Sequence, residues 1–159
     1  MILVLLGTQN NSFHRLLEEV QRNIDNGNIK EEVIVQKGYT KFDSKDMKIY
    51  SQLQIDELKK LTDEANFIIT HAGVGSIITS IEKGKKVIAV PRLKQYKEHV
   101  NDHQKEITKS FNDLGYIIGL NGVEELEEAI KNINKFEPKP YIKNTGKILQ
   151  IVSDFIDKN

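Results

Sequence analysis

The sequence predicts an α/β fold built on a doubly wound, mainly parallel sheet. Short apolar runs of four to six residues alternate with longer segments whose apolar residues recur at helical spacing. Runs that are apolar throughout are typical of strands buried on both faces, and their alternation with helices indicates βα units. Turn-forming residues separate the two patterns. A chain of 159 residues is expected to form one domain spanning residues 1–159.

Each expected strand is a short apolar run that ends at a turn former or a polar stretch. The first run, MILVLL, is followed by the polar turn Gly7–Ser12, and Pro91 ends the fifth run. The strands expected along the chain are Met1–Leu6, Glu32–Gln36, Lys48–Ser51, Asn66–Thr70, Lys86–Val90 and Tyr116–Leu120.

The expected helices are amphipathic segments between these strands. Ser12 is a candidate N-cap for the first helix, whose apolar face holds Phe13, Leu16, Leu17 and Val20. In the second, Ile55, Leu58 and Leu61 share a face, and Gly84 is placed as the C′ residue of the third. The later helices are expected at Gln54–Glu64, Ser76–Lys83, Val100–Leu114, Val123–Ile133 and, after a linker at residues 134–140, Ile142–Ile156.

Composition excludes several classes of protein. There are 23 basic and 23 acidic residues, so the chain lacks the basic excess typical of nucleic-acid binding. The absence of cysteine excludes disulfides, thiolate metal sites and a cysteine nucleophile, and fits a cytosolic protein. The longest apolar run is too short for a membrane span or a signal peptide.

Two loops mark a candidate ligand site, because ligands of such sheets bind beyond the carboxyl ends of the strands. One is Gly7–Ser12 and the other is His71–Ser76, within ITHAGVGSI. Gly73 and Gly75 would let a ligand approach the backbone, and Ser76 lies at an expected helix N-terminus that favours phosphate. The alternative is a tight turn that needs glycine for its geometry alone. Neither a P-loop nor a GxGxxG fingerprint is present.

A third polar stretch, Pro91–Gln104, follows a buried strand and should lie on the same edge of the sheet. His99 and His103 are four residues apart and could share a helix face, as metal ligands do, although no third ligand or HExxH motif accompanies them. Hydrogen bonding to sugar hydroxyls and phosphate oxygens suits the stretch better, and a solvated loop is the remaining interpretation. The sequence has no serine nucleophile elbow, catalytic carboxylate pair or DxD motif.

Four segments in order resemble the donor-binding half of family 28-type glycosyltransferases of GT-B architecture: LLGTQ, ITHAGVGSI, IEKGKKVIAVPR and EHVNDHQ. The resemblance covers nearly the whole chain. It extends to catalytic subunits of two-component bacterial capsule and exopolysaccharide galactosyltransferases, and to the donor-binding subunit of the eukaryotic dolichol-linked N-acetylglucosamine transferase. It implies a Rossmann-like half of a GT-B fold.

The resemblance also implies a donor site. The first loop would face the donor diphosphate, the second the nucleotide, and the polar stretch the transferred sugar. Thr79 stands where the family often has a glutamate that binds the ribose, so nucleotide identity is less firmly implied. The donor-binding residues expected in this way are Gly7, Thr8, Gln9, His71, Gly73, Gly75, Ser76, Thr79, Asp102, His103 and Gln104.

The implied activity is transfer of galactose or N-acetylglucosamine from a UDP-sugar to a lipid-diphosphate-linked acceptor, without a metal or other cofactor. His71, His99 and His103 are candidates for catalysis, but none is assigned as the general base, which in full-length relatives belongs to the other half. A membrane-associated partner subunit would supply that half and recruit this cytoplasmic chain to the inner face of the membrane. A non-catalytic nucleotide-sugar-binding module and a flavodoxin-like domain with another phosphate ligand are the alternatives.

The final expected helix is rich in apolar residues, more than one narrow core stripe requires. It either contributes to the interface with the partner or packs back on its own sheet. The residues concerned are Ile148, Leu149, Ile151, Val152, Phe155 and Ile156.

Overall fold

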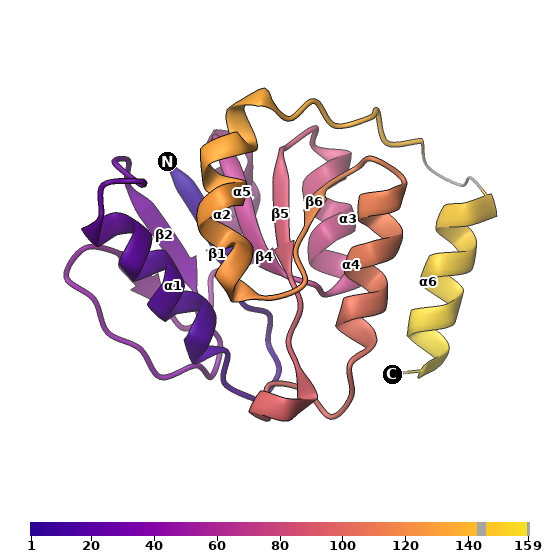
Figure 1. Cartoon of the computed structure of the whole chain (residues 1–159), viewed down its shortest axis with the longest axis horizontal. Helices are drawn as coiled ribbons and strands as arrows, with labels where there is room; N and C mark the ends of the chain where they lie inside the picture. Colours follow the sequence, from indigo (N-terminus) through magenta and orange to yellow (C-terminus); the bar gives the residue numbers. More distant parts are fainter. Residues whose placement is uncertain (143–145, 159) are drawn as a thin grey trace.

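The computed structural model describes residues 1–142 and 146–158, without the side chains of Lys147 and of residues 155–158. Within this part of the chain, six parallel strands form one sheet in the order β3-β2-β1-β4-β5-β6 (Figure 1). This confirms the predicted fold class. The strands are β1 (Ile2–Leu5), β2 (Val33–Gln36), β3 (Lys48–Tyr50), β4 (Phe67–His71), β5 (Val87–Val90) and β6 (Ile118–Gly119).

Strand β1 lies at the centre of the sheet, where the direction of winding changes. Its Leu3 is paired with Ile34 of β2 on one side and with Ile68 of β4 on the other. The loops that follow β1 and β4 therefore leave the same edge of the sheet as neighbours. This is the topological switch point, where parallel sheets of this kind bind ligands.

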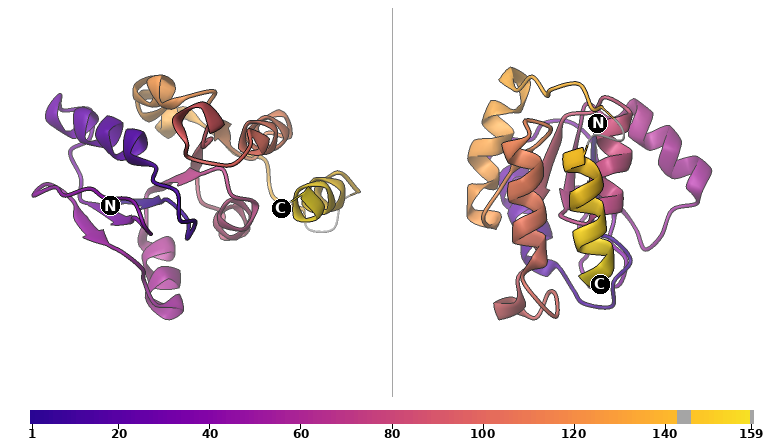
Figure 2. Two further views of the ribbon diagram at one scale, coloured as in Figure 1. Left: turned by 90° about the horizontal axis from the view of Figure 1, so that it is seen from below. Right: turned by 90° about the vertical axis from the view of Figure 1, so that its right-hand side faces the viewer.

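Helices cover both faces of the sheet (Figures 1 and 2). They are α1 (His14–Asp25), α2 (Ile55–Glu64), α3 (Val74–Glu82), α4 (His103–Asp113), α5 (Leu126–Asn132) and α6 (Gly146–Lys158). Residues of β1 alternate between two apolar clusters. Ile2 and Val4 pack with α1 and α5, whereas Leu3 and Leu5 face the cluster that α3, α4 and α6 complete. Both faces of β1 are thus buried, as its wholly apolar sequence predicts.

Several expected helix boundaries are wrong. Ser12 is not the N-cap of α1: that helix begins at His14, after Phe13, whose N–H donates to Thr40 Oγ1 over 3.0 Å. Helix α3 begins at Val74, two residues earlier than expected, because Gly73 is extended and its carbonyl accepts from the N–H of Ile77. Gly84 follows the C-cap with a positive φ of 71°, as predicted.

Apolar residues expected near the starts of α2 and α4 lie exposed at the surface. Ile55, the first residue of α2, is 72% exposed, so the buried face of that helix does not extend to it. Val100 is 76% exposed and lies in a loop, because α4 begins only at His103. The residues before α4 are held instead by Asn101 and Asp102, whose side chains accept from the backbone N–H groups of His103 and Lys94. Such side-chain bonds compete with helix formation.

Helix α6 packs against its own domain, beside α4. Ile148 and Ile151 are buried in the apolar cluster, Val152 packs at its border, and Leu149 is 54% exposed. The side chains of Phe155 and Ile156, part of the same prediction, lie outside the described residues. None of the helices in the described part of the chain has the length and apolarity needed to span a bilayer.

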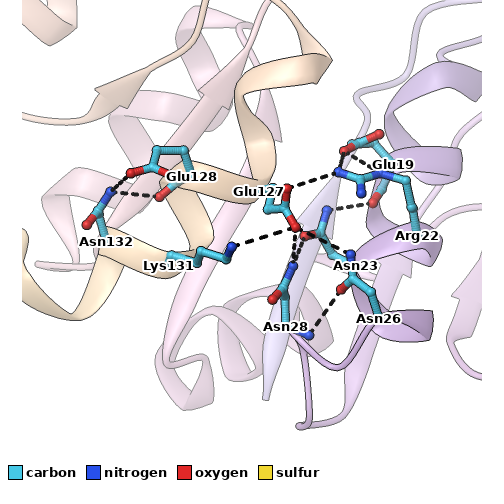
Figure 3. Close-up of polar contacts among 9 residues, drawn as sticks. All are labelled: Glu19, Arg22, Asn23, Asn26, Asn28, Glu127, Glu128, Lys131 and Asn132. Atoms are coloured by element: carbon cyan, nitrogen blue, oxygen red, sulfur yellow. Dashed lines mark hydrogen bonds and ion pairs between the residues drawn. The ribbon is translucent and has the colours of Figure 1, made fainter.

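A polar cluster on the surface joins α1 to α5 (Figure 3). Glu127 of α5 accepts from Asn28 Nδ2 over 2.7 Å and lies 3.7 Å from Arg22 of α1, which also pairs with Glu19. The charged side chains of Arg22 and Glu127 are 49% and 36% exposed to water, which screens their charges, and such pairs contribute little to stability. The cluster lies outside the loops that form the candidate site.

Candidate functional site

Three loops meet at the carboxyl edge of the sheet, and we call them together the three-loop site. They are Gly7–Ser12 after β1, His71–Ser76 at the end of β4 and the start of α3, and Arg92–Gln104 after β5. Side-chain hydrogen bonds connect all three. The sequence places these segments on one edge of the sheet, and the structure confirms that they are in contact with one another.

Gln104 joins the second loop to the third. Its Oε1 accepts from the backbone N–H groups of Ala72, over 3.1 Å, and Arg92, over 3.0 Å. Its Nε2 lies 3.3 Å from His71 Nδ1. Gln104 is only 3% exposed, so its polar atoms are used within the protein. The contact with the transferred sugar that the family resemblance implies for Gln104 stays a prediction.

The ring of His71 lies between two glycines. A Cβ atom added to Gly7 would lie 2.6 Å from the ring, and one added to Gly73 would lie 2.5 Å from it. Gly7 also has a φ of 77°, which favours glycine. Burial lowers the pKa of His71 to about 3, with smaller contributions from the charges of Arg92 and His99. The imidazole is therefore neutral at physiological pH.

Gly75 differs from these two glycines. It lies in the first turn of α3, is exposed, and a Cβ atom added to it would meet no atom within 4 Å. Internal packing therefore does not require glycine here, and glycine within a helix is unfavourable by roughly 0.5–1 kcal/mol relative to alanine. The open space lies at a helix N-terminus, where backbone N–H groups favour an anion.

Arg92 is the charged centre of the three-loop site and is 1% exposed. Its guanidinium donates to the carbonyls of Leu6, Asn11 and Glu98, the last two over 2.8 and 3.1 Å. Its Nε is buried without a hydrogen-bond partner among the described residues. Burial lowers the pKa of Arg92 to about 10, and the charge of Glu98 opposes that shift. Arg92 therefore stays charged at neutral pH and holds the first and third loops together.

Glu98 is a buried carboxylate that ties the third loop to α1. It accepts from Arg15 Nε and Nη2 over 2.7 and 2.9 Å, and from the backbone N–H of Leu93 over 3.0 Å. The Arg15 guanidinium lies 3.6 Å above the ring of Tyr96, which belongs to the same loop. The Arg15 guanidinium is thus held by the Glu98 carboxylate and by the ring of Tyr96.

His99 is also held within the loops. Its Nε2 lies 3.1 Å from the side-chain amide of Gln9, and its Nδ1 accepts from the N–H of Asn101 over 3.3 Å. Burial lowers the pKa of His99, and the charges of Arg92 and His103 lower it further. The expectation that His99 and His103 share a helix face is wrong, because only His103 lies in α4. In the described residues, no three histidine and carboxylate side chains are grouped as metal ligands.

The remaining expected site residues lie at the surface around these loops. Thr8 lines a cavity of about 260 Å³ with Gly38, Tyr39, Ser51 and Gln52. The Thr79 hydroxyl donates to the carbonyl of Gly75 over 2.8 Å, within α3. Ser76 lies in the first turn of the same helix, partly buried, and Asp102 Oδ1 accepts from the N–H of Lys94.

Comparison with known proteins identifies the family. The model of the glycosyltransferase family 28 C-terminal domain matches residues 1–158. The chain belongs to this family. Solved structures of low sequence identity share its fold. An NMR structure of ALG13 has a TM-score of 0.61 at 17% identity, covering 95% of this chain and 93% of that one. The crystal structure of a glycotransferase of kitacinnamycin has a TM-score of 0.56 at 12% identity, covering 98% of this chain and 38% of that one.

Curated relatives of this family 28 domain include subunits of a eukaryotic transferase. The UDP-N-acetylglucosamine transferase subunit ALG13 of Candida albicans is 30% identical over 95 residues, which are 60% of this chain and 31% of the relative. The subunit of the same name from Mus musculus is 37% identical over 62 residues, 39% of this chain and 5% of the relative. The matches thus span less than a third of these two relatives.

Sequence reasoning missed the residues that hold the three-loop site of this family 28 domain together. None of Arg15, Arg92 and Glu98 was among the expected site residues, yet together they form the ionic network of the site, with Arg92 and Glu98 buried. Arg15 and Glu98 are 83 positions apart, so no local pattern could pair them. Tyr39, Ser51 and Gln52, which line the adjacent cavity, were likewise not predicted. A charged residue two positions after a buried strand, as Arg92 is after β5, was an available signal.

Proposed function

We propose that this chain is the donor-binding subunit of a UDP-sugar-dependent glycosyltransferase. The observation that carries the proposal is Gly75, a glycine at the N-terminus of α3 that leaves open space no protein atom occupies. A diphosphate placed there would meet backbone N–H groups and the positive end of the helix. Membership in family 28 and relatives named as UDP-N-acetylglucosamine transferase subunits support UDP as the nucleotide.

The proposed chemistry is stabilisation of the departing UDP by fixed hydrogen-bond donors. As the bond to the sugar breaks, negative charge develops on the diphosphate, and preorganised N–H groups stabilise that charge without a metal ion. The hydrogen-bond donors would come from the N-terminus of α3 and the residue before it, with Gly73, Gly75 and Ser76, and from the first loop, with Gly7 and Thr8. The other residues expected to contact the UDP-sugar are Gln9, Thr79, Asp102 and His103.

The transferred sugar is N-acetylglucosamine or galactose, and the acceptor is a lipid-linked diphosphate in this proposal. The curated relatives favour N-acetylglucosamine. The bacterial capsule and exopolysaccharide enzymes that the sequence resembles favour galactose. A membrane-associated partner would supply the acceptor site and the general base, and would recruit the chain to the cytoplasmic face of the membrane. A purified chain that transfers sugar to a lipid-linked acceptor without any partner would contradict this arrangement.

Gly75→Val should abolish UDP binding while the protein stays folded, because the added side chain fills the space at the start of α3. The measurement is isothermal titration of UDP into each purified variant. Gly146→Val is the matched control: Gly146 also begins a helix and has no atom within 4 Å of an added Cβ, but it lies in α6, outside the three-loop site. Unchanged UDP affinity in Gly75→Val would place the nucleotide elsewhere.

The same titration tests the proposed independence from metal. UDP should bind with the same affinity in excess EDTA and in magnesium or manganese, since the proposed donors are N–H groups. In a transfer assay with the partner present, EDTA should leave the rate unchanged. Loss of transfer in EDTA and its recovery with manganese would contradict a metal-independent mechanism. Partner binding that depends on UDP, without any transfer, would instead indicate a non-catalytic nucleotide-sugar-binding module.

Leu149→Asp should weaken association with the partner subunit at least tenfold while leaving UDP affinity unchanged. Leu149 is 54% exposed on α6, so a charge there does not disturb the core but would disrupt an apolar interface of ordinary size, roughly 800 Å² per side. Pull-down of the two subunits and titration with UDP measure the two effects. Ile55→Asp, at an apolar residue of α2 that is 72% exposed, is the control. Equal association of both variants and the wild type would show that α6 is not at the interface.

A further inference from the structure

The orientation of the Gln104 side chain follows from its neighbours. Two backbone N–H groups, of Ala72 and Arg92, converge on one end of its amide at 3.1 and 3.0 Å. Both groups are donors, so that end must be the carbonyl oxygen. The NH₂ end therefore faces His71 Nδ1, which lies 3.3 Å away. This assignment of the amide is secure because a backbone N–H group can donate a hydrogen bond but cannot accept one.

The amide in turn determines the form of the His71 ring. Because the NH₂ group can only donate, Nδ1 must accept, and a neutral imidazole then carries its proton on Nε2. We propose that Gln104 is a positioning residue that fixes His71 in the Nε2–H form, so that the ring presents a neutral N–H donor to a phosphate oxygen where the two glycine loops meet. The identity of this ligand rests on the proposed function; the tautomer does not.

The Nε2 edge of the ring lies at the junction of the two loops. An added Cβ atom would lie 2.6 Å from Nε2 at Gly7 and 2.8 Å from it at Gly73. No acceptor among the described residues is paired with Nε2, so its proton is available to a ligand. An added side chain at either position would crowd this edge of the ring.

Protonation of the ring is opposed from several sides. It would place an N–H on Nδ1 against the NH₂ group of Gln104, and the charge of Arg92 acts on the same ring. Together with burial, this agrees with a pKa of about 3 for His71. His71 cannot serve as a general base at neutral pH, because Nδ1 is occupied and Nε2 already carries a proton. Its role is that of a hydrogen-bond donor.

The wild-type protein provides the first test. Long-range ¹H–¹⁵N NMR at pH 7 distinguishes the two neutral forms of each of the four histidines, assigned with single His→Gln variants. His71 should show a protonated Nε2 and an unprotonated Nδ1, unchanged down to pH 5. A protonated Nδ1 in the wild type would overturn the proposal, whatever the protein binds.

Gln104→Glu tests the role of the amide directly. Its carboxylate can still accept from Ala72 and Arg92, but it can only accept from His71, so at pH 8 Nδ1 should become protonated. The pKa of His71 should rise toward the ordinary range, against Arg92 and His99, the charged groups that face it. Gln9→Glu is the control, because it adds the same charge beside His99 instead and should leave His71 unchanged. An unprotonated Nδ1 in Gln104→Glu would overturn the proposal; if that variant does not fold, the wild-type spectrum decides.

Titration with UDP tests the ligand. On binding, the Nε2 proton of His71 should become protected from exchange and shift, while Nδ1 stays unprotonated. Binding of UDP, seen at other residues, without any change at His71 would overturn the role of Nε2 as a donor to the ligand. Absence of UDP binding would contradict the proposed nucleotide function and that ligand role, while the tautomer measurement would still decide the role of Gln104.

Discussion

Gly7→Ala should lower the free energy of unfolding by about 3 kcal/mol. Two effects add at this position: a left-handed φ of 77°, unfavourable by roughly 1–2 kcal/mol for an L-residue, and a Cβ atom 2.6 Å from the buried ring of His71. Forcing an extra carbon into a packed site typically destabilises a protein by another 1–3 kcal/mol. Urea unfolding followed by circular dichroism measures the change.

Gly27→Ala separates these two effects. Gly27 has a φ of 83°, but no atom lies within 4 Å of an added Cβ, so only the backbone term applies there. This variant should lose about 1–2 kcal/mol, clearly less than Gly7→Ala. Equal losses in the two variants would show that the His71 ring moves aside at no cost, and that Gly7 is required for its backbone conformation alone.

Arg92→Met should destabilise the protein by about 3–5 kcal/mol, the range found when one partner of a buried charged network is removed. The change leaves the carbonyls of Leu6, Asn11 and Glu98 without their donor, and it removes the charge that lies near the buried Glu98 carboxylate. Because these groups join the first and third loops, UDP affinity should fall as well. Urea unfolding and UDP titration measure the two effects.

Arg22→Met is the matched control for charge removal. Arg22 also lies close to two glutamates, Glu19 and Glu127, but on the exposed surface between α1 and α5 (Figure 3). Water screens that network, so its loss should leave the unfolding midpoint nearly unchanged. If both variants were equally stable, the buried network of Arg92 would contribute to the order of the loops and not to the stability of the fold.

The fold was predictable because it depends on local patterns. Wholly apolar runs indicated the buried strands, and apolar residues at three- and four-residue spacing indicated α1 and the body of α4. The expected start of α4 at Val100 was wrong for an identifiable reason. The helical pattern continues through residues 100–102, but the Asn101 and Asp102 side chains bond to backbone N–H groups and keep this segment out of the helix.

The candidate site was only partly predictable. Its glycines and His71 lie in a recognisable loop between a strand and a helix, which is a local signal. The contact of Glu98 with Arg15 and that of Arg92 with Leu6 join residues more than 80 positions apart, and only the assembled sheet brings them together. The sequence also does not show that Gly73 is required by the His71 ring while Gly75 faces open space.

The central place of β1 has a consequence for how the chain folds. This strand precedes both of its neighbours in the sequence and cannot complete its pairing until β4, some 60 residues later, has been made. Until then, β1 can pair only with β2, and the other edge of this apolar strand has no partner. Pairings between distant segments close slowly because of the loop entropy they must overcome. The nascent chain is therefore most exposed to aggregation before β4 is available, and the three-loop site assembles only after Gln104 has been added.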